Sequence, residues 1–538
     1  MTTAQNLPVV VIGAGPVGLA AAAHLAERGL EPLVLEAGDG PGAAVARWGH
    51  VRLFSPWRYD VDAAARRLLM AGAVGWSEPN PDALPTGADL VEQYLAPLAE
   101  RLVDRAGAQI RYGTRVLAVT KDGADRSRSL GRERLPYLVR TATTGADGSR
   151  AIEEIRAQAV IDASGTYLQP NPLGTSGLPT LGEEESARFL AGGLPDVLGR
   201  DRERFAGRHT LVVGMGHSAA NTLLSLVELA EQDGGPDVPG TRITWAIRGG
   251  SPRRLYGGGA DDELPARGLL GSRLRDAVEA GRIELLTRVA IDRLAPLPAG
   301  AADAVGTAGA ADAAGTADGD TVRVLGTARR DGEDGVLDLT VHNIAAATGF
   351  RPDLAMLREV RLDLDPVVEA PRQIASLIDP NFHSCGTVPA HGEAQLTHPD
   401  AGFYLVGMKS YGRAPTFLLA TGYEQVRSIA AALAGDRTAA DAVELNLPET
   451  GVCSSDLALA ADADGVVSPK ELAASAASSC CAVPAGPQQI SIGLAPAEPA
   501  PVAAAPADAE PADAEPAAPV PAGSVGFSTG VVHGRSGD

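Results

Sequence analysis

The chain has 538 residues and a formal net charge of −21, with 46 lysine and arginine residues against 67 aspartate and glutamate residues. This length predicts two or three domains with cores of their own. The negative charge disfavours nucleic acid and anionic membrane surfaces as main partners, because both attract basic side chains. Four cysteines do not make a secreted disulfide scaffold, so we expect a cytoplasmic protein.

The first predicted elements lie in the apolar run 9–25, VVVIGAGPVGLAAAAHL. No basic residue precedes this run and Gly-Ala-Gly-Pro interrupts it, so it fits neither a signal peptide nor a membrane span. We therefore expect a buried strand that leads into a helix, and no membrane segment.

A glycine pattern stands between this strand and this helix. Gly13, Gly15 and Gly18 form G-x-G-x-x-G, in which the first glycine allows a tight turn, the second lets the backbone approach a pyrophosphate, and the third lets helix and strand pack closely. The amino terminus of the helix adds free N–H groups for phosphates. Glu36 ends the next strand-like run, at the spacing of a carboxylate that binds ribose hydroxyl groups. The segment predicts a dinucleotide site.

A second glycine turn follows in TLVVGMGHSAANTLLSLVELAE (210–231), with alanine in the third position. The next strand-like run, ITWAIRGG, ends in Arg248 and has no acidic residue there. Arginine pairs with a 2′-phosphate that a carboxylate would repel, which favours NADPH over NADH. The alternative for Arg248 is an ordinary exposed arginine. The residues assigned to this site are Gly214, Gly216, His217, Ser218 and Arg248, with His217 at the helix start and Ser218 as the better phosphate donor.

Two dinucleotide turns in one chain require two nucleotides. The economical pairing is FAD at the first turn and NADPH at the second, with hydride passing from the nicotinamide to the flavin.

Residues 1–437 alternate short β-branched runs with Ala- and Leu-rich stretches, as α/β domains with parallel sheets do. The low-complexity segment 299–321 is predicted to be a hairpin loop, and the Pro- and Ala-rich tail 438–538 to be disordered. The predicted fold class is α/β, with two Rossmann-like dinucleotide-binding domains and this tail. The FAD-binding domain comprises 1–170 and 345–437, and the NADPH-binding domain 171–344 is inserted into it.

Beyond the glycine turns, several segments resemble the class B flavin monooxygenases over about residues 7–437. VIDASGTY (160–167) is similar to the segment that closes over FAD, and AAATGFRPD (345–353) to the linker between the domains. GFYLVGMKSYGRAPTFLLATGYEQ (402–425) resembles the closing strand and the helix whose amino terminus faces the isoalloxazine ring. RWGHVRLFSPWRYD (47–60) resembles flavin monooxygenases of arsenic-resistance operons. The family's Phe-x-Gly-x-x-x-His signature before the second glycine turn is absent.

The resemblance implies an NADPH-consuming monooxygenase that transfers one oxygen atom, from molecular oxygen by way of a flavin peroxide, to a small substrate. Five residues become candidates for the substrate pocket, although ordinary core packing explains the aromatic ones equally well: Trp48, Phe54, Trp57, Tyr411 and Arg413. Besides Gly13, Gly15, Gly18 and Glu36, the resemblance implies FAD contacts with Pro16, Trp48, Ser55, Ala163, Ser164, Gly165, Thr348, Gly349, Gly407 and Met408.

The positions of the cysteines bear on which electron acceptor the reduced flavin can use. Disulfide reductases of this fold carry a cysteine pair behind the first turn or a Cys-x-x-Cys in the NADPH domain, whereas the first cysteine here is Cys385. Cys453, Cys480 and Cys481 are candidate thiolate ligands for As(III) or Hg(II), and Ser-Cys-Cys-Ala resembles the carboxyl-terminal pair of mercuric reductases. The pair could equally be incidental in a biased tail. The alternative functions are a thiol- or metalloid-directed flavin reductase that uses the tail, and a metalloid-binding flavoprotein without turnover.

Overall fold

A computed structural model describes residues 7–71, 75–145, 148–233, 240–256, 265–297, 320–378, 388–414 and 417–445. Its first sheet has parallel strands in the order β15-β7-β1-β2-β3. The strands β1, β2, β7 and β15 are buried along their whole length, as expected for a parallel sheet that is covered on both faces. Their bounds are β1 Val9–Ile12, β2 Pro32–Leu35, β3 Gln109–Arg111, β7 Ala159–Asp162 and β15 Phe403–Leu405.

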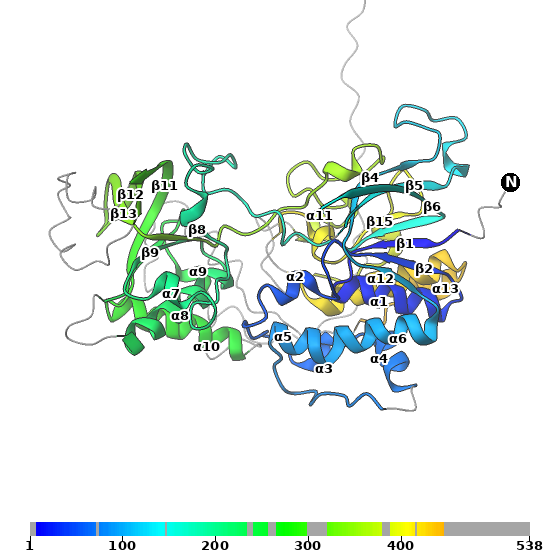
Figure 1. Cartoon of the computed structure of the whole chain (residues 1–538), viewed down its shortest axis with the longest axis horizontal. Helices are drawn as coiled ribbons and strands as arrows, with labels where there is room; N and C mark the ends of the chain where they lie inside the picture. Colours follow the sequence, from blue (N-terminus) through cyan, green and yellow to red (C-terminus); the bar gives the residue numbers. More distant parts are fainter. Residues whose placement is uncertain are drawn as a thin grey trace, which may run out of the picture. The chain divides into compact units, whose positions relative to one another are not determined.

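Helices cover one face of this sheet. Helices α1 (Pro16–Glu27) and α12 (Leu419–Leu433) lie side by side (Figure 1). The alanines 20–23 of α1 are buried, and their small side chains let neighbouring helices approach closely. Shorter helices complete the layer: α2 Ala43–Ala46, α3 Trp57–Asp60, α4 Ala63–Met70, α5 Gly87–Leu90, the π-helical turn η2 Val91–Leu95, α6 Ala96–Ala106, α11 Arg372–Ile378 and α13 Arg437–Asp441.

An antiparallel sheet in the order β4-β5-β6 covers the other face, with strands β4 Thr114–Lys121, β5 Tyr137–Thr144 and β6 Arg150–Ala157. Apolar side chains of both sheets form one cluster, among them Val10, Val160 and Val139.

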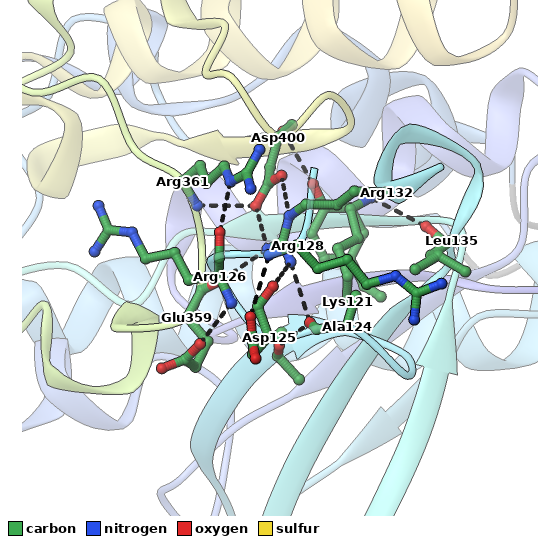
Figure 2. Close-up of polar contacts among 12 residues, drawn as sticks. Lys121, Ala124, Asp125, Arg126, Arg128, Arg132, Leu135, Glu359, Arg361 and Asp400 are labelled. Carbon is green, nitrogen blue, oxygen red and sulfur yellow. Dashed lines mark hydrogen bonds and ion pairs between the residues drawn. The ribbon is translucent and has the colours of Figure 1, made fainter. Parts of the chain in front are cut away.

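The arm between β4 and β5 is anchored by one buried arginine (Figure 2). Arg132 forms a bidentate ion pair with Asp400, with Nε–Oδ1 and Nη2–Oδ2 distances of 2.8 Å, and both side chains are 3% exposed. Arg132 also donates to the carbonyl oxygens of Ala124, Asp125 and Glu359. This arginine thus joins two parts of the chain that are far apart in sequence.

A second sheet has the order β13-β12-β11-β10-β9-β14-β8. Strands β8, β14, β9, β10 and β11 run parallel, whereas β11, β12 and β13 pair antiparallel. Helix α8 (His217–Asp233) follows β9. The remaining bounds are β8 Leu190–Ala191, β9 His209–Val213, β10 Arg242–Ala246, β11 Glu284–Leu297, β12 Thr321–Arg330, β13 Glu333–Val341, β14 Asn343–Ala346, α7 Arg202–Phe205, α9 Arg253–Tyr256 and α10 Pro265–Glu279.

Both sheets contain parallel strands, and in each of them a glycine turn joins a strand to the following helix, β1 to α1 and β9 to α8, which confirms the predicted α/β fold class. The predicted boundary at 344/345 falls inside β14, and the one at 437/438 falls inside α13. Residues 299–319 and 446–538 lie outside the described residues. Within the described part, no helix is long and apolar enough to cross a bilayer.

Candidate dinucleotide sites

Of the three glycines in the first turn, Gly13 and Gly18 have no room for a side chain, whereas Gly15 does. Gly13 has a φ of +101°, and a Cβ built there would lie 2.9 Å from the carbonyl oxygen of Ala163. A Cβ on Gly18 would lie 2.0 Å from the carbonyl oxygen of Gly13, so neither position accepts a side chain. Gly15 has an extended backbone with φ −78°, and among the described residues no atom outside its two chain neighbours lies within 4 Å of its built Cβ. The space beside Gly15 is therefore available to a ligand.

The amino terminus of α1 opens at the same place. Gly15 is the N-cap and makes no side-chain hydrogen bond to the first turn, and Pro16 follows at the first helical position. The backbone N–H groups of the first turn therefore receive no side-chain cap, and together with the helix dipole they favour an anion. A pyrophosphate fits this terminus.

Glu36 lies at the carboxyl end of β2 and faces the glycine turn. Its Oε2 accepts a hydrogen bond from the amide of Ala14, and its Oε1 accepts one from the amide of Gly38, both at 2.7 Å. These bonds orient the carboxylate across the turn. A carboxylate has further lone pairs, so it can still accept hydrogen bonds from ribose hydroxyl groups.

The loop after β7 lies against this turn and carries Ala163, Ser164 and Gly165. The Ser164 hydroxyl donates to Asp162 Oδ1 at 2.6 Å. Lys409 reaches the same residues from another segment, with Nζ 2.7 Å from Asp162 Oδ2 and 3.1 Å from Ser164 Oγ. Sequence reasoning missed Asp162 and Lys409.

The turn Gly407–Tyr411 after β15 is held by helix α12. Gln425 Oε1 accepts from the amide of Gly407 at 2.8 Å, and its Nε2 lies 2.9 Å from Ser410 Oγ and from His391 Nε2. Burial lowers the pKa of His391, so its ring is neutral and its Nε2 accepts the hydrogen bond from Gln425. Met408 is half-buried in this turn. A Cβ on Gly407 would lie 3.3 Å from Val17 Cγ2, so the turn packs on the start of α1.

The second glycine turn repeats the pattern of the first. Gly214 has a φ of +137°, and a Cβ there would lie 2.0 Å from the carbonyl oxygen of Ala347. In the described part of the chain, no atom outside its two neighbours lies within 4 Å of a Cβ on Gly216. Trp245 Nε1 donates to the carbonyl oxygen of Gly214 at 2.7 Å and fixes the turn. His217 is exposed and Ser218 half-buried at the start of α8.

Two arginines lie near the carboxyl end of β10, the strand next to this turn. Arg248 is exposed, two residues beyond Ala246, whose carbonyl oxygen accepts from the amide of Gly214 at 3.1 Å. Arg288, which sequence reasoning missed, has an unusual positive φ of 49°, and its Nε lies 3.6 Å from a Cβ built on Gly250. Arg288 is far from Gly250 in the sequence, so no local pattern indicated that the two residues lie close together.

The two chain crossings between the sheets are tied to each other. Thr348 Oγ1 donates to the carbonyl oxygen of Asn171 at 2.5 Å, and the amide of Asn171 donates to the carbonyl oxygen of Gly349 at 2.9 Å. The segment 345–353, which resembles the domain linker, is thus hydrogen-bonded to the other crossing at Asn171.

The five pocket candidates occupy different environments. Trp57 and Tyr411 are 4% and 3% exposed and belong to the main apolar core, whereas Trp48 and Phe54 are half-buried. The Arg413 side chain forms an ion pair with Glu369, with an Nε–Oε2 distance of 2.6 Å.

The segment that carries these aromatic residues also holds a buried acid. Asp60 is fully buried, and its Oδ1 accepts from the hydroxyl of Ser55 at 2.7 Å. Its Oδ2 has no hydrogen-bond partner among the described residues. Burial raises the pKa of Asp60 to about 7. The Tyr423 hydroxyl of α12 donates to the Asp60 carbonyl oxygen at 2.7 Å.

The proposed thiolate ligands Cys453, Cys480 and Cys481 lie outside the described residues. In the part of the chain that the structure describes, no group of three or more His, Cys, Asp or Glu side chains could hold a metal ion.

Comparisons with known proteins agree with this geometry. Residues 8–81 match the family model of FAD dependent oxidoreductases. The chain is 29% identical over 218 residues to indole-3-pyruvate monooxygenase YUCCA1 of Oryza sativa subsp. japonica, covering 40% of this chain and 44% of the relative. It is 35% identical over 108 residues to thiamine thiazole synthase of Archaeoglobus fulgidus, covering 20% and 38%. The matches span less than half the length of each relative.

Among solved structures, the bacillithiol disulfide reductase Bdr of Bacillus cereus is similar, with a TM-score of 0.50 and 22% sequence identity, covering 80% of this chain and 99% of that chain. This likeness shows the shared two-dinucleotide-domain fold. Residues 8–81 are thus similar to FAD dependent oxidoreductases, and a longer part of the chain is distantly similar to a protein named as a monooxygenase.

Proposed function

We propose that the protein is an NADPH-consuming FAD monooxygenase that acts on a small molecule. One observation carries the proposal. Each of the two sheets has a glycine turn in which the backbone requires the first glycine, while its second glycine, Gly15 or Gly216, faces space that no side chain of the described residues fills. Two such turns provide for two dinucleotides, which a flavoprotein that is reduced by a nicotinamide cofactor needs.

FAD fits the first turn because phosphate, ribose and loop contacts converge there. The amino terminus of α1 binds the pyrophosphate, Glu36 accepts from ribose hydroxyl groups, and the loops after β7 and β15 enclose the remainder. When bound, FAD supplies a ring that takes hydride from the nicotinamide and passes electrons to oxygen. Trp48 and Phe54, which are half-buried, exclude water from the neighbouring space.

NADPH fits the second turn. Gly216 lets the backbone approach the pyrophosphate, and Ser218 donates to a phosphate oxygen at the start of α8. Arg248 supplies the charge that pairs with the 2′-phosphate, with Arg288 as a second cation beside the same loop. The residues provide binding and orientation for the hydride donor.

Two facts favour oxygen over a disulfide as the electron acceptor. No cysteine occurs before Cys385, so neither glycine turn has a thiol near it in sequence. The relative that shares 218 aligned residues is a monooxygenase by name. A reductase that works through the tail would need Cys453, Cys480 or Cys481.

The test is a comparison of flavin oxidation with and without oxygen. The full-length protein is reduced with NADPH under anaerobic conditions, and then divided between air and an anaerobic solution of a disulfide or of Hg(II). We expect reoxidation in air only, and the same rate after alkylation of all four cysteines. Reoxidation by the disulfide or by Hg(II) that alkylation abolishes would replace the monooxygenase with the thiol-directed reductase.

A further inference from the structure

Lysine is rare in this chain, and one lysine is fully enclosed. Three of the 46 basic residues are lysines, and Lys409 is 0% exposed. An ammonium group is a compact charge with rotatable donors, whereas a guanidinium is a planar and bulkier fork. In a sequence that uses arginine almost everywhere, a buried lysine marks a position where a compact cation is needed.

Lys409, Asp162 and Ser164 form a small hydrogen-bond network in which the donor and the acceptor of each bond are known. Nζ donates to Asp162 Oδ2 at 2.7 Å and to Ser164 Oγ at 3.1 Å, and Asp162 is also 0% exposed. Asp162 Oδ1 accepts from both the hydroxyl and the amide of Ser164, at 2.6 and 3.1 Å. The Ser164 proton is therefore committed to Asp162. One lone pair on Ser164 Oγ remains, and Ser164 is the exposed member of the three.

The network lies at the first glycine turn. The loop that holds Ser164 touches Gly13, where a Cβ would stand 2.9 Å from the Ala163 carbonyl oxygen. The turn that holds Lys409 begins at Gly407, which packs on Val17 in the first turn of α1. The ion pair thus joins two backbone segments that both contact the dinucleotide turn and its helix.

We propose that Lys409 and Asp162 are positioning residues that hold Ser164 Oγ as a hydrogen-bond acceptor for a hydroxyl group of the dinucleotide at the first glycine turn. This inference rests on the proposed FAD site. A phosphate oxygen carries no proton at neutral pH and cannot donate to Ser164. The adenine amino group and the flavin N3–H lie at the two ends of the dinucleotide, whereas the ribose and ribityl hydroxyls flank the pyrophosphate at the turn, so we assign a sugar or sugar-alcohol hydroxyl as the partner. Loss of one member of the ion pair leaves an uncompensated buried charge and releases both segments.

The test measures the FAD dissociation constant of the full-length protein after removal of its flavin, from the fluorescence of added FAD. We expect Ser164→Ala to weaken FAD about 3–10-fold, the range of one neutral hydrogen bond, and Ser164→Thr to retain affinity because it keeps the hydroxyl. Lys409→Met should weaken FAD about 10–100-fold, and the double variant Lys409→Met with Asp162→Asn should recover part of that loss.

The matched control is Arg132→Met, which breaks another buried ion pair at the amino end of the same strand β15. It should lower the melting temperature while changing FAD affinity less than about 2-fold, because the first glycine turn lies at the carboxyl end. If Lys409→Met does not fold, the exposed Ser164 variants decide. Wild-type affinity in Ser164→Ala overturns this inference alone, whereas a wild-type protein that binds no FAD overturns the proposed function as well.

Discussion

A single buried carboxyl gives the folded chain a pH-dependent stability. The pKa of Asp60 rises from 3.8 to about 7 because the side chain is buried and only Ser55 donates to it. Between these values the folded state binds more protons than the unfolded chain, so this contribution is complete below pH 3.8 and is lost as the pH rises through 7.

Asp60→Asn should remove this dependence, because the amide keeps the shape and stays neutral. The pKa difference of about 3 units corresponds to about 4 kcal/mol. The free energy of unfolding of the variant minus that of the wild type should therefore increase by up to about 4 kcal/mol between pH 4 and pH 7.5. Parallel urea titrations measure both values. A constant difference across this range would mean that Asp60 ionises normally.

Substitution of Arg248 tests whether this side chain binds the 2′-phosphate of NADPH. Its side chain is exposed beside the second glycine turn, so Arg248→Ala should leave folding unchanged. We expect NADPH binding to weaken by about 1.5–3 kcal/mol, the range for a charged hydrogen bond, while NADH binding hardly changes. Isothermal titration with both cofactors measures the two losses. Equal losses would show that Arg248 does not contact the 2′-phosphate.

At the scale of elements, the arm between β4 and β5 depends on the pair of Arg132 and Asp400. Arg132→Met should cost about 3–5 kcal/mol in the free energy of unfolding, because it leaves Asp400 buried without a cation. The control is Arg140→Met on β5, whose pair with Glu154 is 55% and 45% exposed and should contribute less than about 1 kcal/mol. Chemical denaturation of the three proteins distinguishes the two cases, and equal losses would contradict the assignment.

The sequence predicts those parts of the site that are local in the chain. Gly13, Gly15, Gly18 and Glu36 lie within one strand–helix–strand unit, so their spacing alone indicates what they do. Asp162 and Lys409 are brought together by the order β15-β7-β1, which no local pattern contains. The run 402–425, which resembles a segment of the flavin monooxygenases, includes Lys409 and Gln425, but a resemblance gives no hydrogen-bond partners.

Two of the predicted domain boundaries fall inside elements of the structure. The predicted boundary at 344/345 cuts β14, because Ala345 and Ala346 pair with β9 while the next residues form the crossing. A buried strand that continues into a linker shows no change in composition at its end. The same holds at 437/438, where α13 follows a helix of similar composition.

For the whole molecule, the described contacts of the main unit extend through α13 to the residues that follow it. Arg427 is 7% exposed and donates to the carbonyl oxygens of Ala439 and Ala442. A chain that ends after residue 445 should therefore melt as the full-length protein does and keep its FAD. A chain that ends after residue 436 should lose about 3 kcal/mol, two charged hydrogen bonds at about 1.5 kcal/mol each. Equal melting of both truncated chains would contradict this account.

The central claim is that the chain has two separate dinucleotide sites, and one anaerobic NADPH titration of flavin absorbance tests it in three proteins. The wild type should be yellow with one FAD per chain, and NADPH should bleach it. Gly15→Val and Gly216→Val place their side chains in space that the described residues leave open, so both should fold normally.

Gly15→Val should be colourless, because its side chain occupies the place of the FAD pyrophosphate, and Gly216→Val should be yellow but not bleached. Retention of FAD by a folded Gly15→Val protein, or normal bleaching of Gly216→Val, would contradict the assignment of the two sites.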